Sequence, residues 1–195
     1  FRNKISSLKN DLMTPEMYSR HAMTDFDKMV VDVFKEYEIE LRNDNGVDFD
    51  DLLILPIKLF KENPTLLEKY QERFKYILID EYQDTNEAQY ILTKMLASRY
   101  QNLCVVGDSD QAIYGFRGAN YKNILNFEKD YKLCKTIVLK KNYRSTKVIL
   151  DAANSVIKNN VNRHPKDLES VNGNGDLISY YRARSGLDEI NYVAD

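Results

Sequence analysis

The sequence lacks an apolar run near the length needed to span a bilayer. It also lacks the basic segment followed by an apolar one that is typical of an export signal. Its only two cysteines, Cys104 and Cys134, do not have metal-ligand spacing, which argues against a zinc site and favours reduced thiols with a structural role. These absences predict a cytoplasmic protein with no membrane partner.

The sequence also has little excess charge of either sign. Its 28 Lys and Arg residues face 30 Asp and Glu residues, and the formal net charge is −2. A protein that binds nucleic acid typically carries a basic excess over the whole domain. Any nucleic-acid binding is therefore expected to be local to one part of the surface.

The length of 195 residues is sufficient for one ordinary domain and part of another. The first residue is Phe1, and an apolar periodic stretch over 187–194 runs to the C-terminus without a cap or stop signal. We therefore expect a piece of a longer protein.

The N-terminal part is predicted to be helical. Apolar residues recur at steps of three and four over 25–42, as in an amphipathic helix. The turn residues 43–46 interrupt this pattern and form the first candidate domain boundary. Acids at 48–51 open another helix, which Pro56 is expected to kink or split, and a short helix follows over 66–74.

Two adjacent acids, Asp80 and Glu81, follow the apolar run at 76–79. Such a run is typical of a strand buried on both faces of a sheet, and ligands of open α/β sheets gather where these strands end. One carboxylate at this position can hold hydrated Mg²⁺ while its neighbour accepts a proton from an attacking water. A strand that ends in acids at a solvated turn is the alternative interpretation of this segment taken alone.

A second polar loop is predicted to lie beside these acids. Apolar residues at helical spacing cover 88–96, and another buried-type strand follows at 103–106. A strand–helix–strand crossover is almost always right-handed and makes the two strands parallel neighbours. The loop 107–119 is therefore expected to open at the same sheet edge as Asp80.

A third polar cluster, at 140–145, follows an expected strand at 136–139. Ser145 is expected to cap the next helix. The segment 159–175 is polar and predicts a loop, after which another strand is expected at 177–181. Beyond it, Ser185 and Asp188 form a predicted capping pair for a last helix.

The three polar clusters resemble, in order, the motifs of one family. Residues 80–86 read Asp-Glu-Tyr-Gln-Asp-Thr-Asn, residues 107–119 read Gly-Asp-Ser-Asp-Gln-Ala-Ile-Tyr-Gly-Phe-Arg-Gly-Ala, and residues 142–145 read Asn-Tyr-Arg-Ser. The chain thus resembles the UvrD/PcrA/Rep group of superfamily 1 DNA helicases, and its PcrA-like members in particular, with these segments as motifs II, III and IV. Segments 48–52 and 152–154 fit the same family, so the resemblance covers nearly the whole chain.

This resemblance implies an α/β fold of the RecA-like (P-loop NTPase) type, whose parallel sheet is incomplete in this chain. Residues 1–46 would end a helical insertion subdomain, residues 47–133 would form the second part of the first RecA-like ATPase domain, and residues 134–195 would start the second. The phosphate-binding pattern Gly-x-x-x-x-Gly-Lys-Ser/Thr does not occur in the sequence, and the family places it upstream of Phe1. The fragment alone is therefore expected to hydrolyse ATP negligibly.

The resemblance also implies roles for five residues at an ATP site. Asp80 would bind Mg²⁺, and Glu81 would be the general base that orients and deprotonates the attacking water. Gln111 would sense the γ-phosphate, and Arg144 would be the arginine finger that stabilises charge on the transferring phosphoryl group. Tyr143 would stack on the adenine. ATP and Mg²⁺ are thus the implied cofactors.

Single-stranded DNA is the implied partner of the second polar loop. Tyr114, Phe116 and Arg117 place aromatic faces beside a cation, an arrangement that stacks bases and holds the backbone without reading sequence. The family usually has Trp at the position of Phe116, and Phe stacks with a smaller face. A glycine-flanked turn whose aromatic residues fill the edge of a core is the alternative.

The implied function is that of an ATP-dependent DNA helicase or translocase. It would couple ATP hydrolysis to 3′ to 5′ movement on single-stranded DNA and at duplex junctions, with repair or replication proteins as candidate partners. One alternative is a metal-dependent nuclease with a two-metal cluster, although it leaves Gln111 and Arg144 without a role. A non-catalytic DNA-binding or docking module is the other. The nuclease cluster would consist of Asp80, Glu81, Asp84, Asp108 and Asp110, of which we expect the last three to have structural or ligand-orienting roles.

Overall fold

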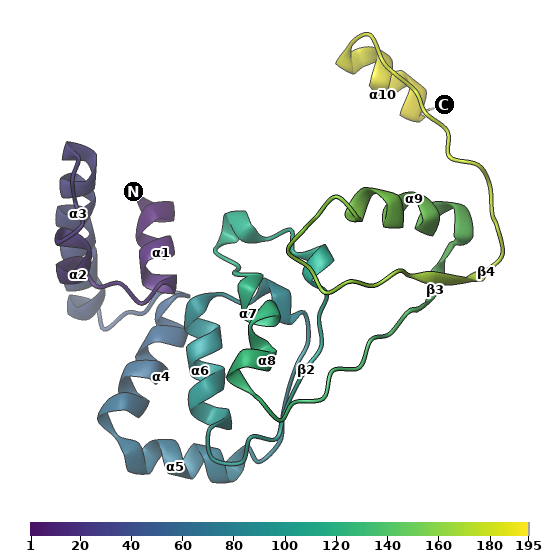
Figure 1. Ribbon diagram of the computed structural model, residues 1–195. Coiled ribbons are helices and arrows are strands. Elements are labelled where there is room, and N and C mark those ends of the chain that lie inside the picture. Colours follow the sequence, from purple (N-terminus) through teal and green to yellow (C-terminus); the bar gives the residue numbers. More distant parts are fainter. Residues whose placement is uncertain (195) are drawn as a thin grey trace. The chain divides into compact units, whose positions relative to one another are not determined.

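The computed structural model describes residues 1–194, which form two compact units with a boundary between Cys134 and Lys135 (Figure 1). Both units mix helices with a small parallel sheet. No helix among these described residues is long and apolar enough to cross a membrane. In the first unit the helices that precede the first strand are α1 (Arg2–Asn10), α2 (Pro15–Ser19), α3 (Asp25–Asn43), α4 (Asp51–Glu62) and α5 (Pro64–Arg73).

The predicted amphipathic helix over 25–42 is confirmed as α3, and local hydrogen bonds explain where it begins. The Thr24 hydroxyl accepts a hydrogen bond from the Asp27 amide at 3.1 Å, and the Asp27 carboxylate accepts one from the Thr24 amide at 3.0 Å. This reciprocal pair satisfies donors that a helix N-terminus otherwise leaves free. The apolar side of α3 packs with α1 and α2 in a core made of Ile5, Leu8, Tyr18, Val30, Val31 and Phe34.

Of the kink or split predicted at Pro56, the split does not occur, because α4 is one helix from Asp51 to Glu62. A proline removes the hydrogen bond to the carbonyl four residues earlier, here that of Leu52. Leu52 itself is 57% exposed. On the other side of Pro56, Ile57 and Phe60 are buried at 2% and 7% exposure, and this packing holds the second half of the helix in place.

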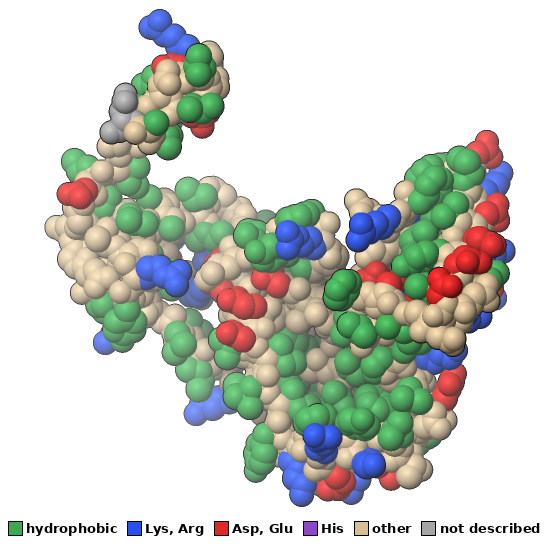
Figure 2. All heavy atoms as spheres, turned by 180° about the vertical axis from the view of Figure 1, so that it is seen from behind, with side chains coloured by type: hydrophobic (Ala, Val, Ile, Leu, Met, Phe, Trp, Pro, Cys, Tyr) green, Lys and Arg blue, Asp and Glu red, His purple; other side chains and the backbone are tan. Residues whose placement is uncertain are grey.

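The predicted strand–helix–strand unit is confirmed. β1 (Ile77–Ile79) pairs in parallel with β2 (Leu103–Val105), and α6 (Glu87–Ala97) connects them. The expected burial on both faces is wrong, because Leu78 is 76% exposed and Cys104 is exposed while their strand neighbours are half-buried. Successive side chains of a strand point to opposite faces, so residues 1–194 leave one face of this two-stranded sheet uncovered. Figure 2 shows hydrophobic side chains gathered on the lower part of the first unit.

Beyond the two strands, short helical segments carry the chain through the polar loops. They are η1 (Tyr82–Asp84), η2 (Ser109–Gln111), η3 (Gly115–Arg117), α7 (Lys122–Leu125) and α8 (Phe127–Asp130). Asn123 of α7 is 5% exposed and donates from its amide to the Thr85 carbonyl oxygen at 3.2 Å. This contact ties the segment after the second polar loop to the first polar loop.

The second unit differs from the prediction in which segments are strands. β3 (Lys141–Thr146) pairs in parallel with β4 (Glu169–Asn172), followed by α10 (Gly186–Ala194), so strands occupy the polar cluster at 140–145 and the predicted loop at 159–175. The strands predicted at 136–139 and 177–181 are wrong. An apolar pattern alone does not make a strand, because a ladder also needs a hydrogen-bonded neighbour. Ile137, for example, is 72% exposed.

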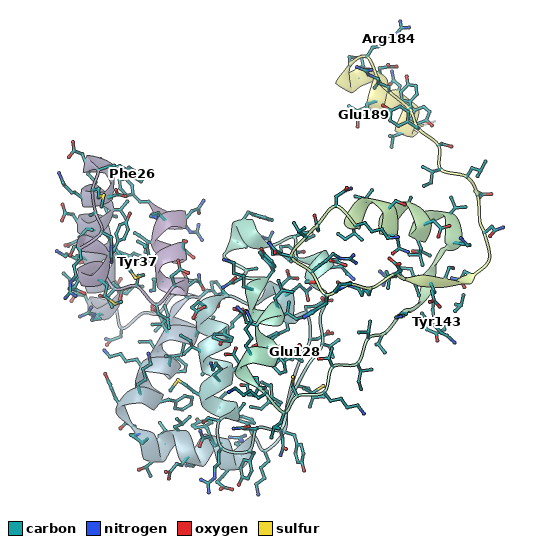
Figure 3. All side chains as sticks on the ribbon, viewed as in Figure 1. Phe26, Tyr37, Glu128, Tyr143, Arg184 and Glu189 are labelled. Carbon is teal, nitrogen blue, oxygen red and sulfur yellow. The ribbon has the colours of Figure 1, made fainter. Side chains whose placement is uncertain are left out.

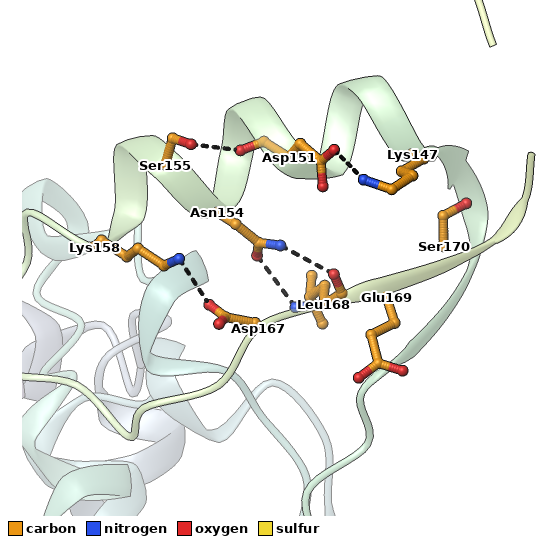
Figure 4. Close-up of a pocket in the computed structure, with 9 residues that line it drawn as sticks. All are labelled: Lys147, Asp151, Asn154, Ser155, Lys158, Asp167, Leu168, Glu169 and Ser170. Carbon is orange, nitrogen blue, oxygen red and sulfur yellow. Dashed lines mark hydrogen bonds and ion pairs between the residues drawn. The ribbon is translucent and has the colours of Figure 1, made fainter. Parts of the chain in front are cut away.

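Two hydrogen bonds from one side chain explain why β4 forms in a polar segment. Asn154 lies on α9 (Lys147–Ile157), and its amide donates to the Leu168 carbonyl oxygen at 3.0 Å while its carbonyl oxygen accepts from the Leu168 amide at 3.2 Å (Figure 4). These two hydrogen bonds position Leu168, the residue directly before β4. The lysines in the adjoining pocket are paired, Lys147 with Asp151 and Lys158 with Asp167 (Figure 4).

The two capping predictions for this unit have opposite outcomes. Ser145 is not the cap of α9, because it lies within β3 and Thr146 occupies the N-cap position. Ser145 instead donates its backbone N–H to the Asn142 side-chain oxygen at 2.7 Å. The pair before α10 is confirmed, since the Ser185 hydroxyl accepts from the Asp188 amide at 3.2 Å.

Candidate functional site

Asp80 and Glu81 directly follow β1, and both are exposed. Asp80 Oδ1 accepts a hydrogen bond from the Glu81 amide at 2.9 Å. Pairing between the two strands continues past their ends, since Val106 N donates to Ile79 O at 2.8 Å and Tyr82 N donates to Val106 O at 3.0 Å. The acids and the loop that begins at Gly107 therefore lie side by side at one edge of the sheet.

Glu81 has a left-handed backbone conformation, with φ 51° and ψ 43°. This conformation costs a residue other than glycine about 1–3 kcal/mol, and such strain is concentrated at functional sites. The turn leaves the Glu81 side chain exposed while the next residue, Tyr82, is fully buried with its ring edge-on to Phe127 at 5.8 Å between centroids. Burial raises the pKa of the Tyr82 hydroxyl.

Gln83 connects the two loops. It is 1% exposed, and its Nε2 donates to Glu81 Oε2 at 2.7 Å and to Asp84 Oδ2 at 3.2 Å. Its Oε1 accepts from the Asp108 amide at 2.9 Å. A buried amide thus uses both of its ends, one on the first polar loop and one on the second.

Gly107 makes this close approach possible. A Cβ atom at this position would lie 2.5 Å from Gln83 Oε1 and 3.0 Å from Tyr82 N. The first distance is shorter than real Cβ contacts, and the second partner is backbone that cannot move alone. Glycine is therefore required here by space, since its φ is not in the positive range.

Asp108 organises the rest of the second loop. Its Oδ1 accepts from the Asp110 amide at 2.9 Å, and its Oδ2 accepts from Gln111 Nε2 at 2.9 Å. Glu81 and Gln111 are therefore connected. Gln83 forms hydrogen bonds to the Glu81 carboxylate and to the Asp108 backbone N–H, and the Asp108 carboxylate accepts a hydrogen bond from Gln111. Sequence reasoning named Glu81 and Gln111 but missed Gln83 and Gly107. The sequence shows these two residues only as an amide two positions after Glu81 and as a glycine after the second predicted strand.

Tyr114, Phe116 and Arg117 lie together at the end of the second loop. The two rings are 6.2 Å apart between centroids, and the Arg117 guanidinium lies 5.2 Å from the Tyr114 centroid and 5.3 Å from that of Phe116. Phe116 is 79% exposed and Tyr114 is 39% exposed. This exposure contradicts the alternative that the aromatics fill the edge of a core. Tyr114 and Arg117 also line a pocket together with Asn86 and Gln89.

Tyr143 and Arg144 belong to the second unit, on β3 rather than on a loop. Tyr143 is 74% exposed (Figure 3), and its carbonyl oxygen accepts from the Asn172 side-chain amide at 2.8 Å. The Arg144 amide donates to the Asn142 side-chain oxygen at 3.0 Å. These bonds hold the strand that carries both side chains. The roles of both residues beside the nucleotide stay predictions.

A single carboxylate is the candidate ligand for Mg²⁺. Within residues 1–194 there is no group of three or more His, Cys, Asp or Glu side chains that could hold a metal ion. Asp84 and Asp108 use carboxylate oxygens to accept hydrogen bonds from the protein. The exposed Asp80 fits the way Mg²⁺ is bound with nucleotides, through one or two carboxylates together with phosphate oxygens and waters.

Comparison with known proteins supports the resemblance. The chain is 52% identical to the ATP-dependent DNA helicase PcrA of Leuconostoc citreum over 189 residues, which are 97% of this chain and 25% of that protein. It is 54% identical to PcrA of Staphylococcus epidermidis over 193 residues, 99% of this chain and 26% of that protein. PcrA of Staphylococcus aureus is 53% identical with the same coverage. The chain thus spans about a quarter of the length of the curated relatives it matches.

Two family models match consecutive parts of the chain. Residues 1–132 match the UvrD/REP helicase N-terminal domain, and residues 137–195 match the UvrD-like helicase C-terminal domain. The first match alone covers more than half of the 195 residues. The chain therefore belongs to the UvrD/REP helicase family.

Proposed function

We propose that the chain is the middle part of an ATP-dependent DNA helicase that moves 3′ to 5′ on single-stranded DNA in the cytoplasm, in repair or replication. Residues 1–46 end a helical insertion subdomain, residues 47–133 form the second part of the first RecA-like domain, and residues 134–195 start the second. The observation that carries the proposal is the hydrogen-bonded connection between Glu81 and Gln111 at the edge of two parallel strands. Duplex junctions and repair or replication proteins are the proposed partners.

The residues at this edge have the chemistry for ATP hydrolysis. Asp80 would hold Mg²⁺, which would supply positive charge beside the phosphate oxygens of the nucleotide. Glu81 accepts a proton from the attacking water, and its exposure lets a water reach it. Gln111 contacts the γ-phosphate. In the second RecA-like domain, Arg144 stabilises charge on the transferring phosphoryl group and Tyr143 stacks on the adenine.

The exposed loop with Tyr114, Phe116 and Arg117 binds single-stranded DNA. Every base has a π face, so stacking on Phe116 is independent of sequence, as a protein that moves along DNA requires. Arg117 lies against both rings and brings a positive charge to the strand at this place. This local cation fits a chain whose formal net charge is −2. Asp108 lies in the same loop and connects it to the proposed ATP site. Its carboxylate accepts a hydrogen bond from Gln111, and its backbone N–H donates to Gln83.

The test is ATP turnover by the full-length helicase that carries this chain, with Glu81→Gln compared with Glu87→Gln. Glu87 is a nearby carboxylate in the first turn of α6. Loss of a general base lowers a rate by about 10²- to 10⁴-fold, so Glu81→Gln is expected to lower the DNA-stimulated kcat by that factor. Glu87→Gln is expected to keep the parental kcat. Wild-type turnover in Glu81→Gln, or ATP-independent cleavage of DNA with Mg²⁺, would overturn the proposal in favour of another function.

A further inference from the structure

We propose that Gln83 is a positioning residue that holds the Glu81 carboxylate in a fixed position relative to the second loop. This inference rests on the proposed function, in which Glu81 is the general base. It goes further by assigning a part in catalysis to a side chain that does not touch the nucleotide.

The first argument is the way the Gln83 amide is used. Its donor end faces the Glu81 carboxylate at 2.7 Å, and its acceptor end faces the Asp108 amide at 2.9 Å. An amide carries both a donor and an acceptor, whereas a carboxylate only accepts and an apolar side chain does neither. Glutamine at position 83 therefore meets both requirements at once.

The second argument is that Glu81 has little else to hold it. Its side chain is exposed, and within residues 1–194 Gln83 Nε2 is the one donor that forms a hydrogen bond to its carboxylate. A free carboxylate on an exposed turn samples several rotamers, and a general base must lie within hydrogen-bond reach of the water that it deprotonates. The bond from Gln83 restricts Glu81 to one arrangement.

The third argument is burial. Gln83 is 1% exposed, so water has little access to the place that its side-chain amide occupies. Removal of the amide also leaves the Asp108 N–H without this acceptor, at the residue whose carboxylate binds Gln111. The hydrogen-bonded connection therefore places the general base and the γ-phosphate contact on one common support, and Gly107 leaves space for it.

The matched control is Gln71, another buried glutamine of the same unit. It is 6% exposed, and its Nε2 donates to Met95 O at 2.8 Å and to Ser98 Oγ at 2.9 Å. Gln71→Met and Gln83→Met both remove an amide and its hydrogen bonds from a buried position at nearly constant size. A purely structural role for Gln83 predicts that both variants lose stability and that neither changes kcat.

The experiment compares kcat, the KM for ATP and the Tm of the full-length helicase and these two variants. Misplacement of a catalytic group by about 1 Å costs a rate factor of order 10², so Gln83→Met is expected to lower kcat at least tenfold with little change in KM. Gln71→Met is expected to lower Tm and to keep kcat. Equal kcat in the two variants and the parent would overturn the inference.

A double-mutant cycle separates positioning from structure. If Gln83 acts through Glu81, Gln83→Glu, which keeps an acceptor for the Asp108 N–H, lowers the residual rate of Glu81→Gln no further, because the group that it positions is already gone. Independent, multiplying effects would overturn the inference. Wild-type turnover in Glu81→Gln would instead overturn the proposed function, so the two failures are distinct.

A second variant covers the case in which Gln83→Met does not fold. Gln83→Glu keeps the size of the side chain and an acceptor for the Asp108 N–H, and in its ionised form it replaces the donor to Glu81 with an acceptor. At a pH where the introduced carboxyl is ionised, it is expected to lower kcat at least tenfold as well. Parental kcat in a folded Gln83→Glu protein at that pH would contradict the positioning role.

Discussion

The side-chain amide of Gln83 lies 2.7 Å from the carboxylate of Glu81, so a buried residue holds an exposed one at the end of β1. Three local features converge on this contact. Glu81 turns the chain through a left-handed conformation, Gln83 enters the interior, and Gly107 leaves space for its oxygen.

Gly107→Ala is expected to destabilise the first unit, because its Cβ would lie 2.5 Å from Gln83 Oε1 and 3.0 Å from Tyr82 N. Overpacking of this kind costs about 1–3 kcal/mol in the free energy of unfolding. Gly115→Ala is the matched control, since nothing lies within 4 Å of a Cβ placed there. Urea denaturation measures both variants. Equal stabilities for the two would contradict the close packing at Gly107.

Lys9→Met is expected to destabilise the chain strongly. Lys9 is 3% exposed, and its Nζ lies 3.0 Å from Glu38, 2.8 Å from Asp48 and 2.7 Å from Asp51, so it ties α1 to α3 and to the start of α4. Breaking a buried ion pair by removing one partner costs about 3–5 kcal/mol, and here three carboxylates with 9–24% exposed side chains would lose their cation. Lys28→Met removes an exposed pair and is expected to cost at most about 1 kcal/mol. Chemical denaturation monitored by circular dichroism compares the two.

Asp27 makes the stability of the N-terminal helices depend on acid pH. Hydrogen bonds from the Tyr18 hydroxyl and from Thr24 lower the pKa of Asp27 from 3.8 to about 2. A carboxyl whose pKa is lower in the folded state stabilises above its unfolded pKa, and this contribution disappears as the pH falls from about 4 towards 2. Asp27→Asn is therefore expected to show a smaller decrease in Tm over this range. An NMR titration of the Asp27 carboxyl that gave an ordinary pKa would contradict the prediction.

Phe116→Ala is expected to weaken single-stranded DNA binding by the full-length helicase. Stacking of a base on an aromatic side chain contributes about 1–3 kcal/mol, which corresponds to a rise in Kd of roughly 5- to 150-fold. Phe49→Ala is the control, because Phe49 is 90% exposed and lies outside the loop. Fluorescence anisotropy with oligonucleotides of different sequence measures the Kd. The loss is expected to be similar for all of them, and a loss confined to one sequence would contradict stacking.

The 195-residue chain by itself is expected to hydrolyse ATP negligibly. Its sequence contains no Gly-x-x-x-x-Gly-Lys-Ser/Thr loop, whose backbone and lysine hold the phosphates in P-loop NTPases. A coupled-enzyme assay with single-stranded DNA measures the rate, and Glu81→Gln in the same chain provides the background. Strong DNA-stimulated turnover that this substitution abolished would contradict the prediction.

Much of the first unit could be predicted because its signals are local. The period of apolar residues and the Thr24 cap define α3, and an apolar run on each side of a helical segment defines the unit of β1, α6 and β2. The second unit was less predictable. β3 and β4 lie in polar segments, and their pairing depends on the contact between Asn154 and Leu168, which are 14 residues apart.

The sequence by itself determined the order of the polar clusters, the helix caps and the residue types at the proposed ATP and DNA sites, because these depend on neighbours within a few positions. Only the tertiary structure decided that Gln83 bridges to Asp108, 25 residues away, and that Lys9 pairs with Asp48, 39 residues away. Such contacts leave no local pattern, since the sequence around a single glutamine or lysine does not show whether its side chain is buried or solvated. Burial gives both side chains a structural role, because in the interior each donor and charge must find a partner within the fold.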